Sequence, residues 1–597
     1  MFSRFLSTGL ALGLAATSLS PCLAQAKTVP VSDFIRHPAF ENVTISPDGK
    51  YLAVVSAIKD TNNYQLVIAP TRSVVKQKPK VTAHLGLTDY AQFAGVYWVN
   101  DKRLVAATAT QHGGFNRPNL TGKLYAINAD GSHQTQLMGF GGYYYLGLID
   151  RLHKNSRAIL VYATQGKDNK AEAYWLDVYT GNVHHVATSP VADGGLTADH
   201  NGDIRIATGV NTLTGWPELY YRDAGSMDWQ NEEKLITSKQ AAAALDTGGP
   251  IMFGPDNKTV YFDDWTNNAA ETMGLYSYNL AAGTKKLLYA NPTVDLGEVI
   301  ESFDRQSLVG VRIYPGKPET LALNPKAPRI QLLAALHQAL PNVQVEITSW
   351  TRNGNEAVVR TWGDTVSPTY YLYTAKPKPN LAFLFHEVPW IQSADLSPMK
   401  PISFKSRDGL TIHGYLTLPH GEKPKNLPMV VYVHGGPEDI RTYWGFSPDD
   451  FDSVSEQILA NHGYAVLSLN YRGSGGYGLK FMAAGFRHWG STMQNDLADG
   501  VKWAVKQGYA NPKRICIYGA SYGGYAALMN SERFPDLYQC AVGYDGVYDL
   551  GLQETRSSDT SRQAAGRLAL TTILGHNQKQ LRAFSPADNA DKLKIPV

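Results

Sequence analysis

The stretch RICIYGASYGGYAALM, residues 514–529, places a serine between a short apolar run and an apolar pattern with helical spacing. Such a pattern predicts a buried strand that turns directly into a helix. Gly519 and Gly523 flank Ser521 in the arrangement G-x-S-x-G, the nucleophile elbow, in which a strained turn lifts a serine hydroxyl above a sheet. Ser521 is therefore the predicted catalytic nucleophile. The alternative is an ordinary strand-to-helix turn.

The sequence around this serine predicts an α/β domain. Two continuous apolar runs, PMVVYVHGG at 428–436 and YAVLSLNYRG at 464–473, are typical of strands buried on both faces of a parallel sheet. The amphipathic segments 451–463 and 491–508 each end at a glycine and are expected to be helices. Strand and helix alternate as in a sheet with helices on both faces.

Residues from about 40 to 390 follow another pattern. NVTISPDGKYLAVVSA, residues 42–57, is expected to form two strands joined by a Pro-Asp-Gly turn, and similar units recur every 40 to 50 residues or so. Six units are clear, and SFDRQSLVGVRIY at 302–314 is assigned to a seventh. The spacing predicts a β-propeller with seven blades, followed by the α/β-hydrolase domain; a pair of β-sandwiches is the competing architecture.

Length and composition fit this two-part organisation. A chain of 597 residues is too long for one hydrophobic core. The net charge of +3 gives no reason to expect nucleic acid as a partner. The expected domains are a signal peptide at 1–26, a propeller at 27–395, and a hydrolase domain at 396–597 that is incomplete at its C-terminus.

The first 26 residues have the pattern of a secretory signal peptide. Arg4 is followed by an apolar stretch and by a small-residue cleavage site at Ala24-Gln25-Ala26. The protein is therefore expected to be periplasmic or secreted, with no membrane span after cleavage; a retained anchor is the alternative. Beyond this segment the cysteines are Cys516 and Cys540, which are expected to be buried free thiols, although an oxidising compartment also allows a disulfide.

The motifs VVYVHGGP, NYRGSGGYG, WGSTMQNDLADGVKW and IYGASYGGYAAL, together with the repetitive β-region, resemble the prolyl oligopeptidase family of serine peptidases. The acylaminoacyl-peptidase and dipeptidyl-peptidase branch is the most similar. The resemblance is dense over 400–597 and architectural before that. It implies Ser521 as nucleophile and the amides of Gly436 and Tyr522 as the oxyanion hole. It also implies a propeller that covers the active site and admits short peptides.

A serine hydroxyl needs a histidine base and a carboxylate that orients this base. In this fold both follow the serine, and the histidine comes last. His576 is the one histidine after Ser521, and it lies in a polar segment. Asp545 and Asp549 are expected to be turn residues. His434 precedes the serine and is expected to be structural.

The family resemblance places the aspartate after a Lys-Ile-Pro phrase, and here DKLKIPV ends the sequence at Val597. The triad aspartate and histidine are therefore expected beyond residue 597, and the 597-residue chain is expected to be nearly inactive.

The predicted function is hydrolysis of short peptides. An esterase with the same elbow and a non-catalytic propeller binding protein with a degenerate hydrolase domain remain alternatives. Glu232 and Glu233 could hold a substrate amino terminus, but such pairs are usually solvated surface. No metal cluster, phosphate loop or nucleotide motif is recognisable, so no cofactor and no metal are predicted. Oligomeric state and cleavage preference stay open.

Overall fold

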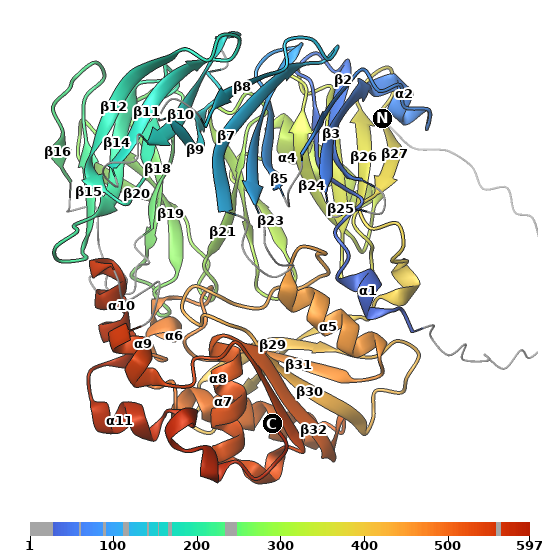
Figure 1. Cartoon of the computed structure of the whole chain (residues 1–597), viewed down its shortest axis with the longest axis vertical. Helices are drawn as coiled ribbons and strands as arrows, with labels where there is room; N and C mark the ends of the chain where they lie inside the picture. Colours follow the sequence, from blue (N-terminus) through green and yellow to red (C-terminus); the bar gives the residue numbers. More distant parts are fainter. Residues whose placement is uncertain are drawn as a thin grey trace, which may run out of the picture.

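The computed structural model describes residues 28–58, 61, 63–87, 91–110, 119–139, 143–152, 155–164, 170–232, 248–556 and 563–597. The predicted signal peptide at 1–26 and Glu233 lie outside the described residues. The chain forms two stacked parts, a ring of β-sheets and, below it, an α/β domain (Figure 1).

The ring is a β-propeller, as predicted. Within the described residues its antiparallel strands form seven consecutive units, of which the third and fourth share one eight-stranded sheet and the sixth has three strands. The first three units comprise β1 (Phe40–Ile45), β2 (Tyr51–Ala57), β3 (Tyr64–Pro70), β4 (Ala83–Gly86); β5 (Ala91–Trp98), β6 (Arg103–Thr110), β7 (Asn119–Asn128), β8 (Thr135–Met138); β9 (Tyr144–Asp150), β10 (Ala158–Thr164), β11 (Lys170–Asp177) and β12 (Val183–Ala192).

The last four units comprise β13 (Leu196–Ala198), β14 (Ile204–Val210), β15 (Pro217–Tyr221), β16 (Gln230–Asn231); β17 (Gly249–Phe253), β18 (Thr259–Trp265), β19 (Met273–Asn279), β20 (Thr284–Tyr289); β21 (Leu296–Glu301), β22 (Leu308–Ile313), β23 (Glu319–Ala322); β24 (Gln344–Trp350), β25 (Glu356–Trp362), β26 (Thr369–Thr374) and β27 (Asn380–His386). The stretch assigned to a seventh unit from the sequence supplies β22.

The predicted turns are built by their own side chains. Between β1 and β2, the Asp48 carboxylate accepts hydrogen bonds from the Ser46 hydroxyl at 2.8 Å and from the Lys50 amide at 3.1 Å. An aspartate that satisfies the free groups of a tight turn in this way sets the hairpin register.

In the part of the propeller region that the structure describes, the helices are α1 (Val31–Phe34), α2 (Thr71–Val75) and α4 (Pro328–Ala339). Helix α4 was not predicted, because the sequence pattern of this region indicates strands. Its apolar side, with Ile330, Leu333 and Leu336, packs against Val309 and Val345 of the neighbouring strands. The helix follows the three-stranded sixth unit and covers apolar surface beside it.

The second part is an α/β domain with a six-stranded sheet. The strands lie in the order β28-β29-β31-β30-β32-β33, and the last four are parallel. Their bounds are β28 (Met399–Lys405), β29 (Thr411–Thr417), β30 (Leu427–Val433), β31 (Ala465–Asn470), β32 (Ala510–Ala520) and β33 (Cys540–Tyr544). The two apolar runs predicted as buried strands are β30 and β31. All six residues of β31 are buried, as expected for a strand covered on both faces.

The described helices of this part are α5 (Phe451–Asn461), α6 (Leu479–Ala483), α7 (Thr492–Lys506), α8 (Tyr522–Arg533), α9 (Leu550–Arg556), α10 (Ala564–Leu574) and α11 (Gln578–Ala583), with short 3₁₀ turns at 393–395, 535–537, 586–588 and 590–592. Helices α5, α7 and α8 pack on the strands, and α9 contacts α10 and α11. The helices predicted at 451–463 and 491–508 are α5 and α7. Leu497, Val501 and Ala504 of α7 are fully buried, so the predicted apolar stripe faces the core. No helix among the described residues is long and apolar enough to cross a membrane.

The expectation of free thiols is wrong. Cys516 on β32 and Cys540 on β33 are paired directly opposite each other and form a disulfide. The sequence did not reveal that the two apolar runs are neighbours in the sheet, which brings the thiols together.

The chain packs on the hydrolase domain before it enters the propeller. Val29 and Phe34 belong to one apolar cluster with Phe446 and Val454, and the Val29 amide donates to the Asn461 side chain at 2.8 Å. The segment assigned to the propeller at 27–395 therefore begins with residues that contact α5. Asp295 provides another of the links between the two parts, because its carboxylate accepts the amides of Met273 in the propeller and Gly478 in the hydrolase domain.

Candidate active site

Ser521 lies at the sharp turn between β32 and α8. Its φ of 55° and ψ of −121° are rare for a residue other than glycine and indicate a strained backbone. The residue is exposed, whereas the six that follow it in α8 are buried. Among the described residues, no side chain or backbone group is hydrogen-bonded to the Ser521 hydroxyl. The turn therefore presents a free hydroxyl at the carboxyl end of β32, a strand with a neighbour on each side.

The glycines of the motif are required by their surroundings. A Cβ at Gly523 would overlap the carbonyl oxygen of Val433, and a Cβ at Gly519 would lie 2.6 Å from the carbonyl carbon of Gly523. Strand β30, the helix start and the elbow thus pass so close to one another that no side chain fits between them. This close approach is the physical reason for the spacing G-x-S-x-G.

The loop after β30 runs beside the elbow. A Cβ placed on Gly435 would lie 3.5 Å from Cβ of Ser521, so the two segments are in contact distance. Gly436, next in this loop, is exposed and has a φ of 96°. The amides of Gly436 and Tyr522 donate to none of the described residues. The structure thus brings the predicted nucleophile together with the loop that carries one predicted oxyanion donor, and leaves both donors free.

The start of α8 adds a favourable field. The first amides of a helix have no partner within it and carry partial positive charge. Ser521 immediately precedes α8, and its carbonyl oxygen accepts the amide of Tyr525 at 3.0 Å as the first helical bond. Negative charge that develops beside Ser521 is therefore stabilised by the helix end.

His434 is a structural histidine, as expected. It is fully buried, Nδ1 lies 2.7 Å from the Gly435 carbonyl oxygen, and Nε2 lies 2.9 Å from the Ser474 hydroxyl oxygen. Since a carbonyl can only accept, Nδ1 carries the proton and Nε2 accepts from Ser474. Burial lowers the pKa of His434 to about 4, so the ring is neutral at physiological pH. Both nitrogens are engaged, which leaves neither for Ser521.

Stacked aromatic rings pack against the loop that follows β30. The ring of Tyr471 lies parallel to His434 with centroids 4.6 Å apart, and it also stacks on Tyr522 at 5.4 Å. The Tyr471 hydroxyl donates to the His434 carbonyl oxygen at 2.8 Å. Trp489 meets Tyr522 edge to face at 4.6 Å. Tyr471 lies in the NYRGSGGYG motif, but its role was not predicted from the sequence.

The glycine-rich loop that carries Ser474 is anchored by buried charge. Arg472 donates to the Asp496 carboxylate through Nε and Nη2, both at 2.7 Å, and pairs with Asp408 at 2.7 Å. Burial raises the pKa of Asp496 to about 6 despite this partner. Such a bidentate pair fixes the loop in one orientation. Ser474 can therefore hold His434, and His434 in turn holds the oxyanion loop.

Glu438 is a second residue that the sequence analysis missed. It follows the His-Gly-Gly-Pro turn directly, and its carboxylate accepts the indole N–H of Trp489 at 3.3 Å. Burial raises the pKa of Glu438 to about 7. A carboxyl group two residues from Gly436 that is near half-protonation at neutral pH makes the electrostatic potential of this loop sensitive to pH.

The remaining candidates lie elsewhere. His576 is exposed in the turn between α10 and α11. The Asp549 carboxylate accepts the amide of Leu552 and so caps α9, which confirms it as a turn residue. Asp545 is exposed and directly follows β33. Glu232 follows β16, and its amide donates to the Leu219 carbonyl at 2.8 Å.

Taken together, these groups can perform one kind of chemistry. An exposed hydroxyl at a strained turn can attack a carbonyl carbon, and free amides at Gly436 and Tyr522 can bind the oxygen of the resulting tetrahedral adduct. Among the described residues no group of three or more His, Cys, Asp or Glu side chains is arranged to hold a metal ion.

Known proteins resemble the chain in the same two parts. The family described as "Prolyl oligopeptidase family" matches residues 450–597. Dipeptidyl aminopeptidase BIII of Pseudoxanthomonas mexicana is 28% identical over 610 aligned residues, which cover 98% of this chain and 81% of that protein.

Solved structures share the fold. A puromycin hydrolase has a TM-score of 0.65 at 15% identity, covering 97% of this chain and 88% of that one. The acylaminoacyl peptidase of Pyrococcus horikoshii has a TM-score of 0.60 at 16% identity, covering 95% and 86%. At such identities the likeness concerns the fold, a propeller followed by a hydrolase domain.

Proposed function

The hydrolase domain of this chain belongs to the prolyl oligopeptidase family of serine peptidases, and from this premise we propose that the protein hydrolyses short peptides through an acyl-enzyme on Ser521. One observation carries the proposal: the Ser521 hydroxyl stands exposed and unpaired at a turn with φ 55°, next to the free amides of Gly436 and Tyr522.

In the acylation step, Oγ of Ser521 forms a bond to the scissile carbonyl carbon, and the carbonyl π electrons move to the oxygen. The amides of Gly436 and Tyr522 donate to this oxyanion. The serine proton passes to the base and from it to the leaving amine as the C–N bond breaks. Water then attacks the ester in the reverse sense and releases the acid product.

The proposal places the base and the orienting aspartate of the triad after residue 597. Two observations support this assignment. Both ring nitrogens of His434 have other partners, and His576 lies in an exposed helix turn. Loss of the base costs about 10⁶ in kcat in a well-studied serine protease, so residues 28–597 alone are expected to be nearly inactive.

The proposed substrates are short peptides because the propeller stacks on the hydrolase domain, and the two contact at Asp295 and Gly478 (Figure 1). The end-to-end similarity to a dipeptidyl aminopeptidase favours release of dipeptides from a free amino terminus. A substrate with an acetylated amino terminus should then be hydrolysed at least tenfold more slowly than the same peptide with a free amine.

The proposed location is an exported one, periplasmic or secreted. The Cys516–Cys540 disulfide supports it, because structural disulfides persist in oxidising compartments and are rare in reducing ones.

The test compares residues 28–597 with the same chain extended through its natural downstream coding sequence. Dipeptide p-nitroanilides should be cleaved by the extended chain and not by its Ser521→Ala variant. Ser393→Ala, a serine on a surface turn between the two domains, is the control and should retain full activity. Full activity of residues 28–597 would contradict the triad assignment, and hydrolysis of p-nitrophenyl esters alone would indicate an esterase.

A further inference from the structure

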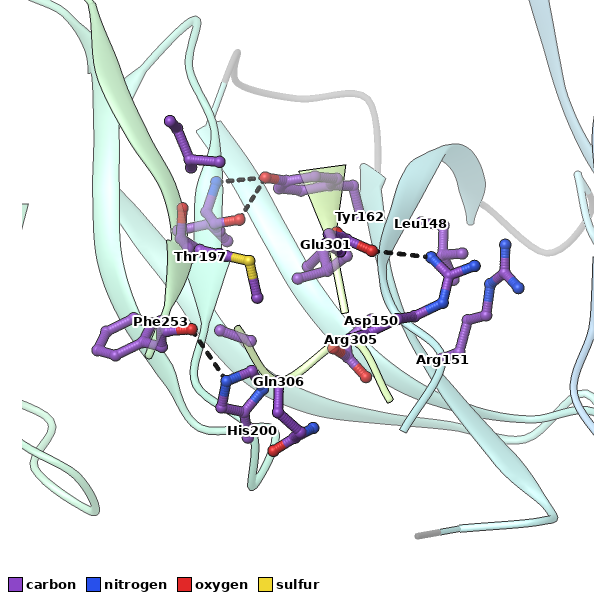
Figure 2. Close-up of a pocket in the computed structure, with 15 residues that line it drawn as sticks. Leu148, Asp150, Arg151, Tyr162, Thr197, His200, Phe253, Glu301, Arg305 and Gln306 are labelled. Atoms are coloured by element: carbon purple, nitrogen blue, oxygen red, sulfur yellow. Dashed lines mark hydrogen bonds and ion pairs between the residues drawn. The ribbon is translucent and has the colours of Figure 1, made fainter. Parts of the chain in front are cut away.

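The propeller contains a cavity of about 420 Å³ that is separate from the Ser521 site. Its walls come from the ends of four strands that each begin a blade: β9, β13, β17 and β21. Charged and polar side chains line one side, and Figure 2 shows Arg151, Arg305 and Glu301 there. On the other side lie Phe253 and His200.

This cavity lies toward the end of the propeller that faces away from the hydrolase domain. Strand β21 starts directly after Asp295, which contacts Gly478 of the hydrolase domain. The cavity lies at the other end of this strand, at Glu301 and the following turn with Arg305. Six residues of strand span about 17 Å, so the cavity and the interface with the hydrolase domain are at opposite ends of the blade.

Most polar groups in the cavity already have partners. Arg305 pairs with Glu301 at 3.3 Å, and the His200 ring nitrogen Nε2 lies 2.9 Å from the Phe253 carbonyl oxygen. The Tyr162 hydroxyl is hydrogen-bonded to the backbone of Leu196. These bonds hold the walls in place. The Arg305 guanidinium has five N–H donors and uses one of them on Glu301.

Arg151 differs from its neighbours. Within the described part of the chain its guanidinium has no hydrogen bond and no ion pair; it lies 5.1 Å from the ring centroid of Tyr97. The residue is half-buried, and burial together with the charge of Arg305 lowers the pKa of Arg151 to about 10. Two guanidinium groups that are close together and partly removed from water repel each other. An anion that contacts both groups stabilises them.

The charges around Arg151 restrict which anion fits. The carboxylates of Asp150 and Glu301 also line the cavity, so the two arginines leave little net positive charge. A dianion such as phosphate would meet repulsion from both carboxylates. A single carboxylate can form the parallel pair of hydrogen bonds that a guanidinium offers, and a cationic or polar remainder of the ligand suits the acidic groups.

We propose that this cavity binds the carboxylate of a short peptide or amino acid, with Arg151 as the principal ligand and Arg305 beside it. The identification of the ligand as a peptide rests on the proposed function. The prediction that a carboxylate binds rests on the cavity alone. The site is distant from Ser521 and is a binding site, not a second catalytic centre.

The experiment is isothermal titration calorimetry on residues 28–597 carrying Ser521→Ala, so that no turnover contributes. The probes are trialanine with a free carboxyl terminus, trialanine amide and inorganic phosphate. The free acid should bind at least tenfold more weakly to the Arg151→Gln variant than to the parent, and Arg151→Lys should lose less. Arg157→Gln is the matched control, because Arg157 is an exposed arginine after the same strand, β9, and pairs with Asp177.

Three outcomes would overturn the proposal: equal binding of the acid and the amide, an unchanged affinity in Arg151→Gln, or phosphate binding as tight as the free acid. The peptide Ala-Ala-Glu amide separates the two sources of a carboxylate. Binding of this peptide that depends on Arg151 assigns the site to acidic side chains as well as carboxyl termini. The calorimetric experiment measures binding. Failure of the peptidase assay would therefore leave the proposed carboxylate site untouched, and failure of the binding experiment would leave the proposed peptidase activity untouched.

Discussion

The backbone amide of Ser521 donates a hydrogen bond to the carbonyl oxygen of Tyr544 at 3.0 Å. This bond joins the elbow to the last residue of β33. Four residues earlier on that strand, Cys540 is cross-linked to Cys516 on β32, the strand that ends at the elbow. The disulfide and the Ser521 amide thus fix the same pair of strands at two points.

Removing the disulfide should therefore loosen the elbow as well as lower stability. A cross-link over 24 residues contributes about 3 kcal/mol in the chain-entropy description. We expect the Cys516→Ser/Cys540→Ser double variant to melt several degrees lower, as measured by differential scanning calorimetry. Dithiothreitol should lower the melting temperature of the parent and leave the double variant unchanged. Equal sensitivity of both proteins would contradict the prediction.

Any side chain at Gly523 should destabilise the hydrolase domain. A Cβ there overlaps the Val433 carbonyl oxygen, which is fixed in β30 and cannot move aside. Gly523→Ala should cost about 1–3 kcal/mol and lower the melting temperature of the hydrolase domain by about 2 to 12 °C. Gly86→Ala is the control, because a Cβ at Gly86 meets no atom within 4 Å. A melting temperature unchanged in both variants would mean that the elbow relaxes freely.

Local sequence patterns predicted much of this fold because the strands of the two domains have different patterns of apolar residues. Alternating strands with Asp and Gly turns gave the propeller, and continuous apolar runs gave β30 and β31. Helix α4 was missed because QLLAALHQAL lies among strand-like repeats, although Pro328 at its first position is a helix start signal. The disulfide escaped because strand adjacency is a tertiary property: Cys516 and Cys540 become neighbours when β32 pairs with β33.

In the active site, too, the local features were predictable from the sequence and the tertiary contacts were not. Ser521 and the glycines around it form one continuous motif, since the strain is local, and so the motif was readable. The support of the oxyanion loop is not local. His434, Tyr471 and Ser474 come from two separate loops and meet through stacking and hydrogen bonds. The sequence around Arg151 did not indicate a binding site, because whether a guanidinium has a partner depends on the side chains that surround it in the folded protein.

The contact at Asp295 should hold the glycine-rich loop. Its carboxylate accepts the amide of Gly478 at 3.1 Å and that of Met273 at 2.8 Å, across the two domains. Asp295→Ala should speed amide hydrogen exchange over residues 472–478 at least tenfold, because the amide of Gly478 loses its acceptor. Asp228→Ala, which removes an exposed propeller carboxylate, should leave the exchange unchanged. Unaltered exchange in Asp295→Ala would contradict the prediction and would mean that the other contacts of the loop, such as those of Arg472 and Ser474, are sufficient to hold it.

The buried, neutral His434 should make the hydrolase domain sensitive to acid. Its pKa is about 4 in the folded protein and about 6.5 in the unfolded chain, so between these values the unfolded state binds more protons. Stability is then complete above pH 6.5 and falls as the pH drops toward 4, by about 3 kcal/mol in all. The melting temperature of the parent should fall more steeply between pH 7.5 and 4.5 than that of His434→Gln, which keeps a donor and an acceptor for Gly435 and Ser474. His462→Gln, a substitution of an exposed histidine at the end of α5, should follow the parent. Parallel slopes in all three proteins would mean that His434 takes up its proton in the fold as readily as in the unfolded chain, against its burial and its two hydrogen bonds.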